Sequence, residues 1–302
     1  MTSDTSDPQT RAALEQILDH VRQEPSRTWS IIISLYGDAI VPRGGSVWLG
    51  TVLAFFNALG ISDGVVRTAM SRLASDGWLT RTKVGRNSYY RLAEKGVETF
   101  RRATEHIYRP SPPPWPGAFD LLIAGEGANT EALRAAMAEA EFGSPAPGVF
   151  VAPAGSAAPQ GNVIRLRATG DADAQRALAA KSWPLDEIGE AYRRFVAAFE
   201  PLRSALAAGG ALSDLDALVA RVLLIHEYRR IVLRDPILPV EVLPDGWQGT
   251  KARRLCAEIY GPVVVGSEGW LDQNAIDEAG NPLPGSAEIV RRFKTLETGQ
   301  FG

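Results

Sequence analysis

The sequence predicts an α+β protein with an N-terminal winged helix-turn-helix, a middle ferredoxin-like α+β module and a mainly helical C-terminal domain. Three observations support this class. A polar-faced helix is followed at once by a basic hairpin, a proline-rich segment comes next, and short strands then alternate with helices before a long helical stretch. We expect five parts: a helical leader, a winged domain, a linker, a ferredoxin-like module and a helical domain, at residues 1–26, 27–109, 110–117, 118–183 and 184–302.

Helices dominate the chain before the linker. Asp7 or Thr10 is placed to cap a helix that runs to Arg22. Three more helices and then two strands are expected at residues 28–37, 46–59, 62–76, 78–82 and 88–92. Ser62 is the expected N-cap of the last of these helices, and Gly77 is its stop. Three helices followed by a hairpin form the order of a winged helix-turn-helix.

The linker is defined by five prolines between Arg109 and Pro116. Proline stiffens the chain into an extended spacer, so this segment is suited to pass a domain rotation on to the part before it. Beyond it we expect three strands and two helices in the order β-α-β-β-α, at residues 119–124, 129–142, 148–152, 163–168 and 171–182. That order is typical of a small ferredoxin-like module. Helices are then expected at residues 185–199, 212–233 and 251–260.

Composition bounds the function classes. Hydrophobic residues make up 45% of the sequence, yet no apolar run approaches the roughly 20 residues of a membrane span. The polar first ten residues are not those of a signal peptide. The single cysteine, Cys256, forms no internal disulfide and supports no cysteine-rich zinc site. We therefore expect a cytoplasmic protein without a membrane partner, a metal or a cofactor.

Charge is spread unevenly along the chain. Residues 27–109 hold 12 basic and 6 acidic residues, whereas the rest of the chain holds 20 basic and 29 acidic residues. A basic N-terminal third attracts phosphates, while an acidic remainder limits unspecific binding to polyanions.

The helix expected at residues 62–76 has two distinct faces. Val66, Ala69, Met70 and Leu73 recur with the spacing of a buried stripe. A second face carries polar side chains, namely Arg67, Thr68, Ser71 and Arg72. An α-helix fits the major groove of B-DNA, where arginine pairs with guanine and Thr or Ser reaches base edges or phosphates. A solvated amphipathic helix is the alternative for such a pattern in isolation.

The hairpin that follows this helix favours DNA binding over a merely solvated helix. It is crowded with polar residues, namely Arg81, Lys83, Arg86, Asn87 and Tyr89. Its short turn is suited to a wing that lies along the DNA backbone or in a minor groove. A basic hairpin by itself is more often a solvated edge strand, but a polar-faced helix directly before it favours a DNA-binding unit.

A second polar cluster lies in the C-terminal part. His226, Arg229 and Arg230 share a helix face, and Arg234 follows near the end of that helix. These cations could hold a phosphate-rich ligand such as a CoA thioester, with Trp247 stacking on a ring. The equally weighted alternative is a buried salt-bridge network, whose acidic partners would be Glu227, Asp235, Asp245 or Glu258. A lone histidine such as His226 is more often a hydrogen-bonded structural residue than a metal ligand.

An enzyme and a ligand-free dimerisation module are the rival functions. His226 with Glu227 or Asp235 could transfer protons. The sequence has no GxSxG elbow, phosphate-cradling glycine loop or HExxH pattern, so no catalytic residue is assigned. Binding of acyl-CoA thioesters without their turnover would separate a regulator from both rivals.

The sequence resembles the PaaX family of phenylacetate-catabolism repressors. The resemblance rests on VRTAMSRL at 66–73 and DGWL at 76–79, and more specifically on HEYRRIVLRDPILP at 226–239 and LPDGW at 243–247. It implies a homodimeric repressor that binds a double-stranded DNA operator and is released by phenylacetyl-CoA. Ser62, Asp63 and Gly64 stand where the family pattern has bulkier polar residues, which points to a different operator.

Overall fold

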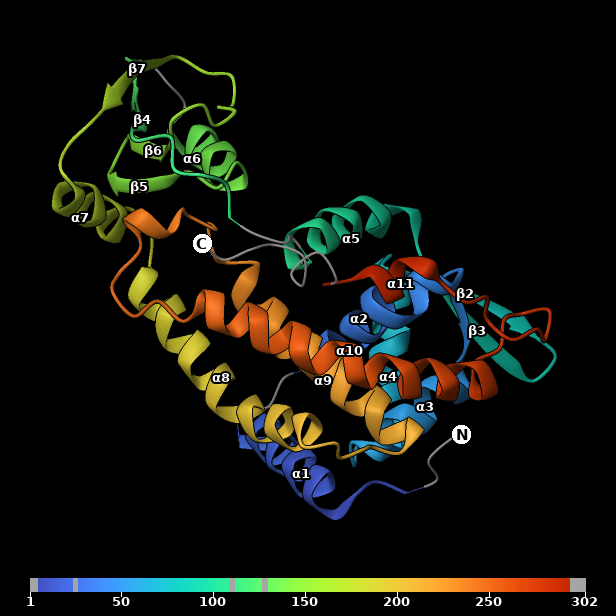
Figure 1. Cartoon of the computed structure of the whole chain (residues 1–302). Helices are drawn as coiled ribbons and strands as arrows, with labels where there is room; N and C mark the ends of the chain where they lie inside the picture. Colours follow the sequence, from blue (N-terminus) through green and yellow to red (C-terminus); the bar gives the residue numbers. More distant parts are fainter. Residues whose placement is uncertain (1–4, 24–26, 109–111, 127–129, 294–302) are drawn as a thin grey trace. The chain divides into compact units, whose positions relative to one another are not determined.

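The computed structural model describes residues 5–23, 27–108, 112–126 and 130–293 (Figure 1). The chain forms two compact units. Unit 1 comprises Met1–Pro110, Arg194–Arg230 and Lys251–Gly302, and unit 2 comprises Ser111–Arg193 and Ile231–Thr250. The expected leader and winged domain therefore share one unit with most of the C-terminal helices. The boundary after Pro110 lies at the expected linker, of which residues 110 and 111 are outside the described part.

Unit 1 begins with helices close to those expected. They are α1 (Pro8–Gln23), α2 (Thr28–Leu35), α3 (Leu49–Ala58) and α4 (Asp63–Ser75). Asp7 caps α1, because its carboxylate accepts hydrogen bonds from the amide and hydroxyl of Thr10 at 3.2 and 3.1 Å. A π-helical turn, η1 (Tyr36–Ile40), and a short 3₁₀ turn, η2 (Val41–Arg43), follow α2.

One expected helix starts as a strand instead. Ser46–Trp48 forms β1, and only Leu49–Ala58 is helical. The hairpin strands β2 (Leu79–Val84) and β3 (Asn87–Leu92) join β1 in an antiparallel sheet of order β1-β3-β2. A three-residue strand has no periodic signal of its own, and its pairing with β3 fixes the extended backbone. Helix α5 (Glu94–Ile107), which was not among the expected helices, follows the sheet.

Unit 1 is completed by helices from the second half of the chain. They are the later part of α8 (Leu185–Ala207), most of α9 (Asp214–Val232) and α10 (Gly249–Asn274), and α11 (Ala287–Arg291). No helix in the described ranges is long and apolar enough to cross a membrane.

A buried charge cluster lies inside unit 1, and we call it the Asp38 cluster: Asp38, Tyr108, Arg221, Tyr260 and Arg292. The Asp38 carboxylate accepts from Arg221 Nε at 2.6 Å, Arg292 Nη1 at 2.8 Å, Tyr260 Oη at 2.9 Å and Tyr108 Oη. Burial opposes the charged form, but the two guanidiniums outweigh it and hold the pKa of Asp38 below its usual value. The cluster thereby joins η1, α9, α10 and the segments after α5 and α11.

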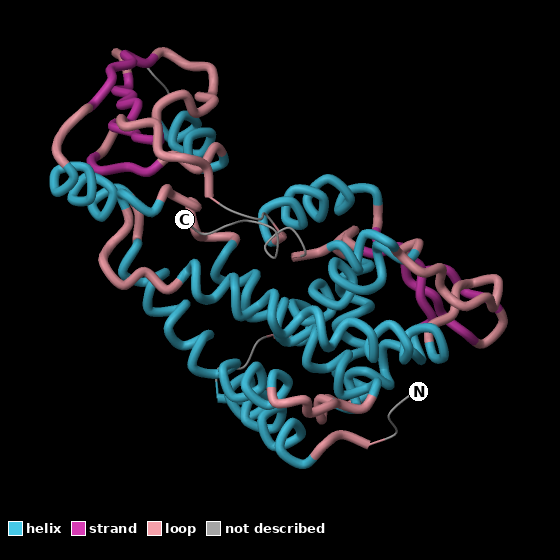
Figure 2. Tube along the Cα trace, viewed as in Figure 1, coloured by secondary structure: helices cyan, strands magenta, loops and turns pink. Residues whose placement is uncertain are grey.

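Unit 2 contains a four-stranded antiparallel sheet. Its strands are β4 (Phe119–Ala124), β5 (Gly143–Ala146), β6 (Val149–Pro153) and β7 (Val163–Ala168), in the order β5-β6-β4-β7. Its helices are α6 (Thr130–Glu139), α7 (Ala172–Ser182) and the start of α8, with a 3₁₀ turn, η3 (Val240–Val242). Figure 2 shows the strands of the chain gathered in two separate sheets.

The order of elements in unit 2 differs from a ferredoxin-like module. Strand β5 was not expected, and α7 follows the last strand instead of preceding it, which gives the order β-α-β-β-β-α. Apolar side chains cover both faces of the sheet. Leu122 and Phe150 pack with Leu133 and Met137 of α6, and Phe119 on the opposite face packs with the segments around α7 and η3.

Candidate nucleic-acid interface

Helix α4 is anchored by one apolar stripe and leaves its other side open. Val66 and Met70 are fully buried and Leu73 nearly so, as the spacing predicts. Ala69, the fourth residue of the expected stripe, is only half-buried. Ser62 occupies the N-cap position, although its side chain makes no capping hydrogen bond, and Gly77 ends the helix with φ +75°.

The predicted polar face of α4 is exposed. The side chains of Arg67 and Arg72 are 56% and 72% exposed, and each lies 3.7–3.8 Å from an exposed carboxylate, Asp63 or Asp76. Exposed pairs of this kind contribute little, so both guanidiniums can exchange their partner for a phosphate or a base edge. Ser71 is exposed as well. Thr68 is exposed, but its hydroxyl donates to the carbonyl oxygen of Gly64 at 2.9 Å.

The wing is a tight hairpin. Val84 pairs with Asn87, which leaves Gly85 and Arg86 as a two-residue loop. Gly85 has φ +58°, the conformation that a type II′ turn requires at its first central position. Lys83, Arg86 and Asn87 are exposed on this hairpin.

Two predicted wing residues have roles inside the sheet. Arg81 is exposed, but its guanidinium donates to Ser88 Oγ at 2.8 and 3.2 Å. Tyr89 is buried, because β1 pairs along β3 and places Trp48 opposite it. The assignment of Tyr89 to a DNA surface is therefore wrong; this residue belongs to the core between the two strands.

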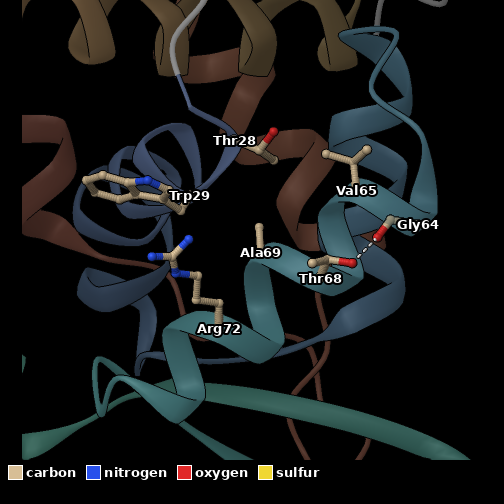
Figure 3. Close-up of a pocket in the computed structure, with 7 residues that line it drawn as sticks. All are labelled: Thr28, Trp29, Gly64, Val65, Thr68, Ala69 and Arg72. Atoms are coloured by element: carbon tan, nitrogen blue, oxygen red, sulfur yellow. Dashed lines mark hydrogen bonds between the residues drawn. The ribbon is translucent and has the colours of Figure 1, made fainter.

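Two grooves flank α4. The first, which we call the wing groove, has a volume of about 380 Å³ and is lined by residues of α3, α4 and the hairpin, among them Asn57, Arg67, Arg86 and Asn87. The second, which we call the Trp29 groove, has a volume of about 350 Å³ and lies between α2 and α4 (Figure 3). Arg72 lines this second groove. The two arginines of α4 thus line grooves on different flanks of the helix, in agreement with their spacing, since residues five positions apart are separated by about 140° around a helix axis.

Sequence reasoning missed Trp29, Val65 and Asn57 as residues of this surface. A helical projection carries a signal for Val65, since it precedes Thr68 and Arg72 by three and seven positions and shares their side of α4. Nothing in the sequence places Trp29 beside α4, because the two helices meet only in the fold.

The predicted ligand residues His226 and Arg229 are engaged within unit 1. His226 is fully buried, and its Nδ1 lies 2.9 Å from the hydroxyl oxygen of Ser34 on α2. Arg229 donates to the same hydroxyl at 2.6 Å and to the carbonyl and hydroxyl oxygens of Ser30 at 2.9 and 2.8 Å. Both side chains tie α9 to α2, so the expectation that they are presented to a ligand is corrected: they have structural roles.

The other three predicted ligand residues are more accessible. Arg230 pairs with Glu227 at 3.1 Å and is 40% exposed, and Arg234 is exposed just beyond α9. Trp247 is half-buried in unit 2 and packs edge-on against Tyr192 at a centroid distance of 5.7 Å. Asp235, offered as a proton-transfer candidate, accepts a hydrogen bond from Tyr192 at 2.8 Å and is buried.

These features define an α+β protein whose N-terminal part exposes a basic helix and hairpin over an apolar core. Known proteins then place it in a family. The family model described as PaaX-like protein matches residues 27–96, and the model described as PaaX-like protein C-terminal domain matches residues 183–273. The Transcriptional repressor PaaX of Escherichia coli (strain K12) is 36% identical over 298 residues, which cover 92% of this chain and 94% of that protein. The chain belongs to the PaaX family, as its sequence motifs predict.

A solved structure also matches. The Uncharacterized protein Rv0674 from Mycobacterium tuberculosis has 26% sequence identity to the chain and a TM-score of 0.47, over 72% of this chain and 88% of that chain.

Proposed function

We propose that this protein is a DNA-binding transcriptional repressor of an aromatic-acid catabolic operon of the phenylacetate type, and that its N-terminal part works as a winged helix. The observation that carries the proposal is the joint exposure of Arg67 and Arg72 on α4 with Lys83 and Arg86 on the wing. The relative from Escherichia coli is named a transcriptional repressor, which supports a regulatory rather than an enzymatic role. A cytoplasmic location follows from a DNA partner.

The contacts divide between the two elements. The exposed face of α4 enters the major groove, where Arg72, Thr68 and Ser71 reach base edges. The wing holds the DNA backbone through Lys83 and Asn87. Arg67 and Arg86 come from different elements to one groove, which is suited to a phosphate at the edge of the major groove. Arg43, also in the basic third, is buried against Glu268 and takes no part.

Arg72→Ala is expected to weaken operator binding by about 1–3 kcal/mol, because it removes a base contact. Arg67→Ala and Lys83→Ala remove phosphate contacts, so they are expected to weaken binding to all sequences about equally and to lower the salt dependence. The operator is first selected from random DNA with the full-length protein. Gel shifts at two salt concentrations then compare Arg67→Ala, Arg72→Ala and Lys83→Ala with Arg193→Ala, an exposed control on α8. Wild-type operator affinity in both arginine variants of α4 would exclude that helix as the recognition element.

We propose that the protein acts as a homodimer on a near-palindromic operator, because one winged helix covers too few base pairs for specificity against a genome. The helical part at residues 185–260 is one candidate for the contacts. The sheet of unit 2 is the second candidate for the dimer contacts, and the exposed edge strand β7 supports it. This strand lies at the sheet edge and exposes Ile164 and Leu166 on one face. Light scattering distinguishes a dimer from a monomer.

We also propose that an aryl-acyl-CoA, with phenylacetyl-CoA as the first candidate, weakens operator binding. Arg230 and Arg234 are cations at the end of α9 that could bind CoA phosphates, and Trp247 offers an aromatic surface in the next segment. Because α9 is bonded to α2 through Arg229, a shift of α9 on ligand binding would reach the DNA-binding part directly.

Phenylacetyl-CoA is expected to lower operator affinity about 5–150-fold, the usual range of allosteric coupling, and free phenylacetate is expected to do much less. Both compounds are titrated into an operator-binding assay with wild-type protein and with Arg230→Ala. Release by the free acid alone would remove the role assigned to the arginines, and hydrolysis of the thioester would favour the enzyme alternative.

A further inference from the structure

The Trp29 groove is an apolar feature on an otherwise polar DNA-facing surface. It is lined by Thr28 and Trp29 of α2 and by residues of the first half of α4 and Arg72. Figure 3 shows Trp29 and Val65 on opposite sides of the groove, with the methyl group of Ala69 between them and the guanidinium of Arg72 pointing toward Trp29. The lining is mostly apolar, and a cation stands at one end.

Two walls of this groove are formed by exposed apolar side chains. Trp29 of α2 is 40% exposed, and Val65 of α4 is 49% exposed because it lies outside the buried stripe of that helix. The start of α4 is open as well, because a Cβ atom at Gly64 would meet no neighbouring atom within 4 Å. Apolar surface held open next to exposed arginines is typical of a binding surface rather than of a core edge.

Thr68 adds to the apolar character of this face. The Thr68 hydroxyl donates its hydrogen bond to the carbonyl oxygen of Gly64 in the same helix (Figure 3). The hydroxyl proton is therefore not available to a base, whereas the side-chain methyl group is. Val65 and Thr68 lie one turn apart at the N-terminal end of α4, the end of a recognition helix that reaches base edges. The first turn of α4 therefore offers methyl groups to the major groove.

Thymine is the base whose major-groove edge presents a methyl group. We propose that the Trp29 groove receives the 5-methyl group of a thymine in the operator, with Val65 as the specificity-determining contact and Trp29 as the opposite wall. This inference rests on the proposed function and adds to it the base that the first turn of α4 selects. The groove continues into Arg72 on the same helix side, which favours DNA over an apolar segment of another protein as its occupant.

Deoxyuridine, which lacks only that methyl group, provides the test. Each thymine of the selected operator is replaced singly by deoxyuridine, and affinities are measured for the wild type, for Val65→Ala and for Val97→Ala. Val97 is a matched control, because it is a valine on α5 with a similar exposure of 53%. Alanine favours a helix at least as well as valine, so Val65→Ala is expected to fold.

The wild type is expected to lose about fourfold in affinity at one thymine of each half-site, the value of one buried methyl group. Val65→Ala is expected to lose this sensitivity at that position, and Val97→Ala to keep it. Specific operator binding without any deoxyuridine effect, or with an effect that Val65→Ala leaves unchanged, overturns the inference while the proposed function stands. Failure to select any specific DNA overturns both.

Discussion

Asp38→Asn is expected to lower the free energy of unfolding by about 3–5 kcal/mol, the cost of removing one partner from a buried ion network. Asp38 is buried and forms ion pairs with two guanidiniums, of which Arg221 is fully buried and Arg292 nearly so. An amide keeps the size of the side chain but not its charge, so both arginines would lose their fully buried anion and keep the more exposed carboxylates of Glu268 and Glu288. Since whole domains are stable by only about 5–15 kcal/mol, this one change removes a large fraction of that margin.

Urea unfolding at pH 7 measures the effect, with Asp19→Asn as the control. Asp19 also pairs with an arginine, Arg22 at 2.8 Å, but both side chains are exposed, so the control is expected to cost less than about 1 kcal/mol. The acid dependence gives a second readout. The pKa of Asp38 is lower in the folded state than in the unfolded chain, where it is about 3.9. The stability that Asp38 contributes is therefore fully present above about pH 3.9 and is lost as the pH falls below that value.

In Asp38→Asn this acid-linked loss of stability is expected to be absent. If the variant unfolds like the wild type and keeps its acid dependence, the Asp38 cluster contributes no net stability. An equal cost for Asp19→Asn would contradict the role of burial.

The sequence predicts α4 and the hairpin well because their signals are local. The spacing of Val66, Met70 and Leu73 and the alternation along β2 and β3 depend only on near neighbours. Tyr89 was misassigned because its burial depends on β1, a strand of three residues that lies within an apparently continuous helical pattern. The grooves beside α4 were not predictable either, since they require helices α2 and α3 to be in place.

The Asp38 cluster and the contacts of His226 and Arg229 with α2 were not predictable either, because their partners are distant in the sequence. Asp38 looks like an ordinary acid near a helix end, and its cationic partners come from 183 and 254 residues later in the chain. His226 and Arg229 look like ligand residues on a helix face, but Ser34 and Ser30 meet them from 192 to 199 residues earlier. Residue type and spacing gave the correct helix for His226 and Arg229, whereas their partners on α2 decided whether these side chains are structural or available.

His226 is expected to make the protein less stable as the pH falls from about 6.5 toward 3. Burial, together with the charges of Arg229 and Arg230, lowers the pKa of its imidazole to about 3. Between these two values the unfolded chain binds a proton that the folded chain does not, so stability is full above about pH 6.5 and declines below it. From pH 6.5 to pH 5 the loss is about 2 kcal/mol, at 1.36 kcal/mol per pH unit.

Urea unfolding at pH 7 and pH 5 of the wild type and His226→Asn tests this expectation, because asparagine cannot take up the proton. The variant starts less stable at pH 7, but the difference between its two pH values is expected to be smaller than that of the wild type by about 2 kcal/mol. His20→Asn, which alters a half-buried histidine on α1 and leaves the contact with Ser34 intact, is the matched control and is expected to follow the wild type. The same pH dependence in the wild type and His226→Asn would mean that His226 binds its proton equally well in the folded and unfolded chain. Attraction to Glu227, 3.6 Å from its Nε2, would then offset the effect of burial.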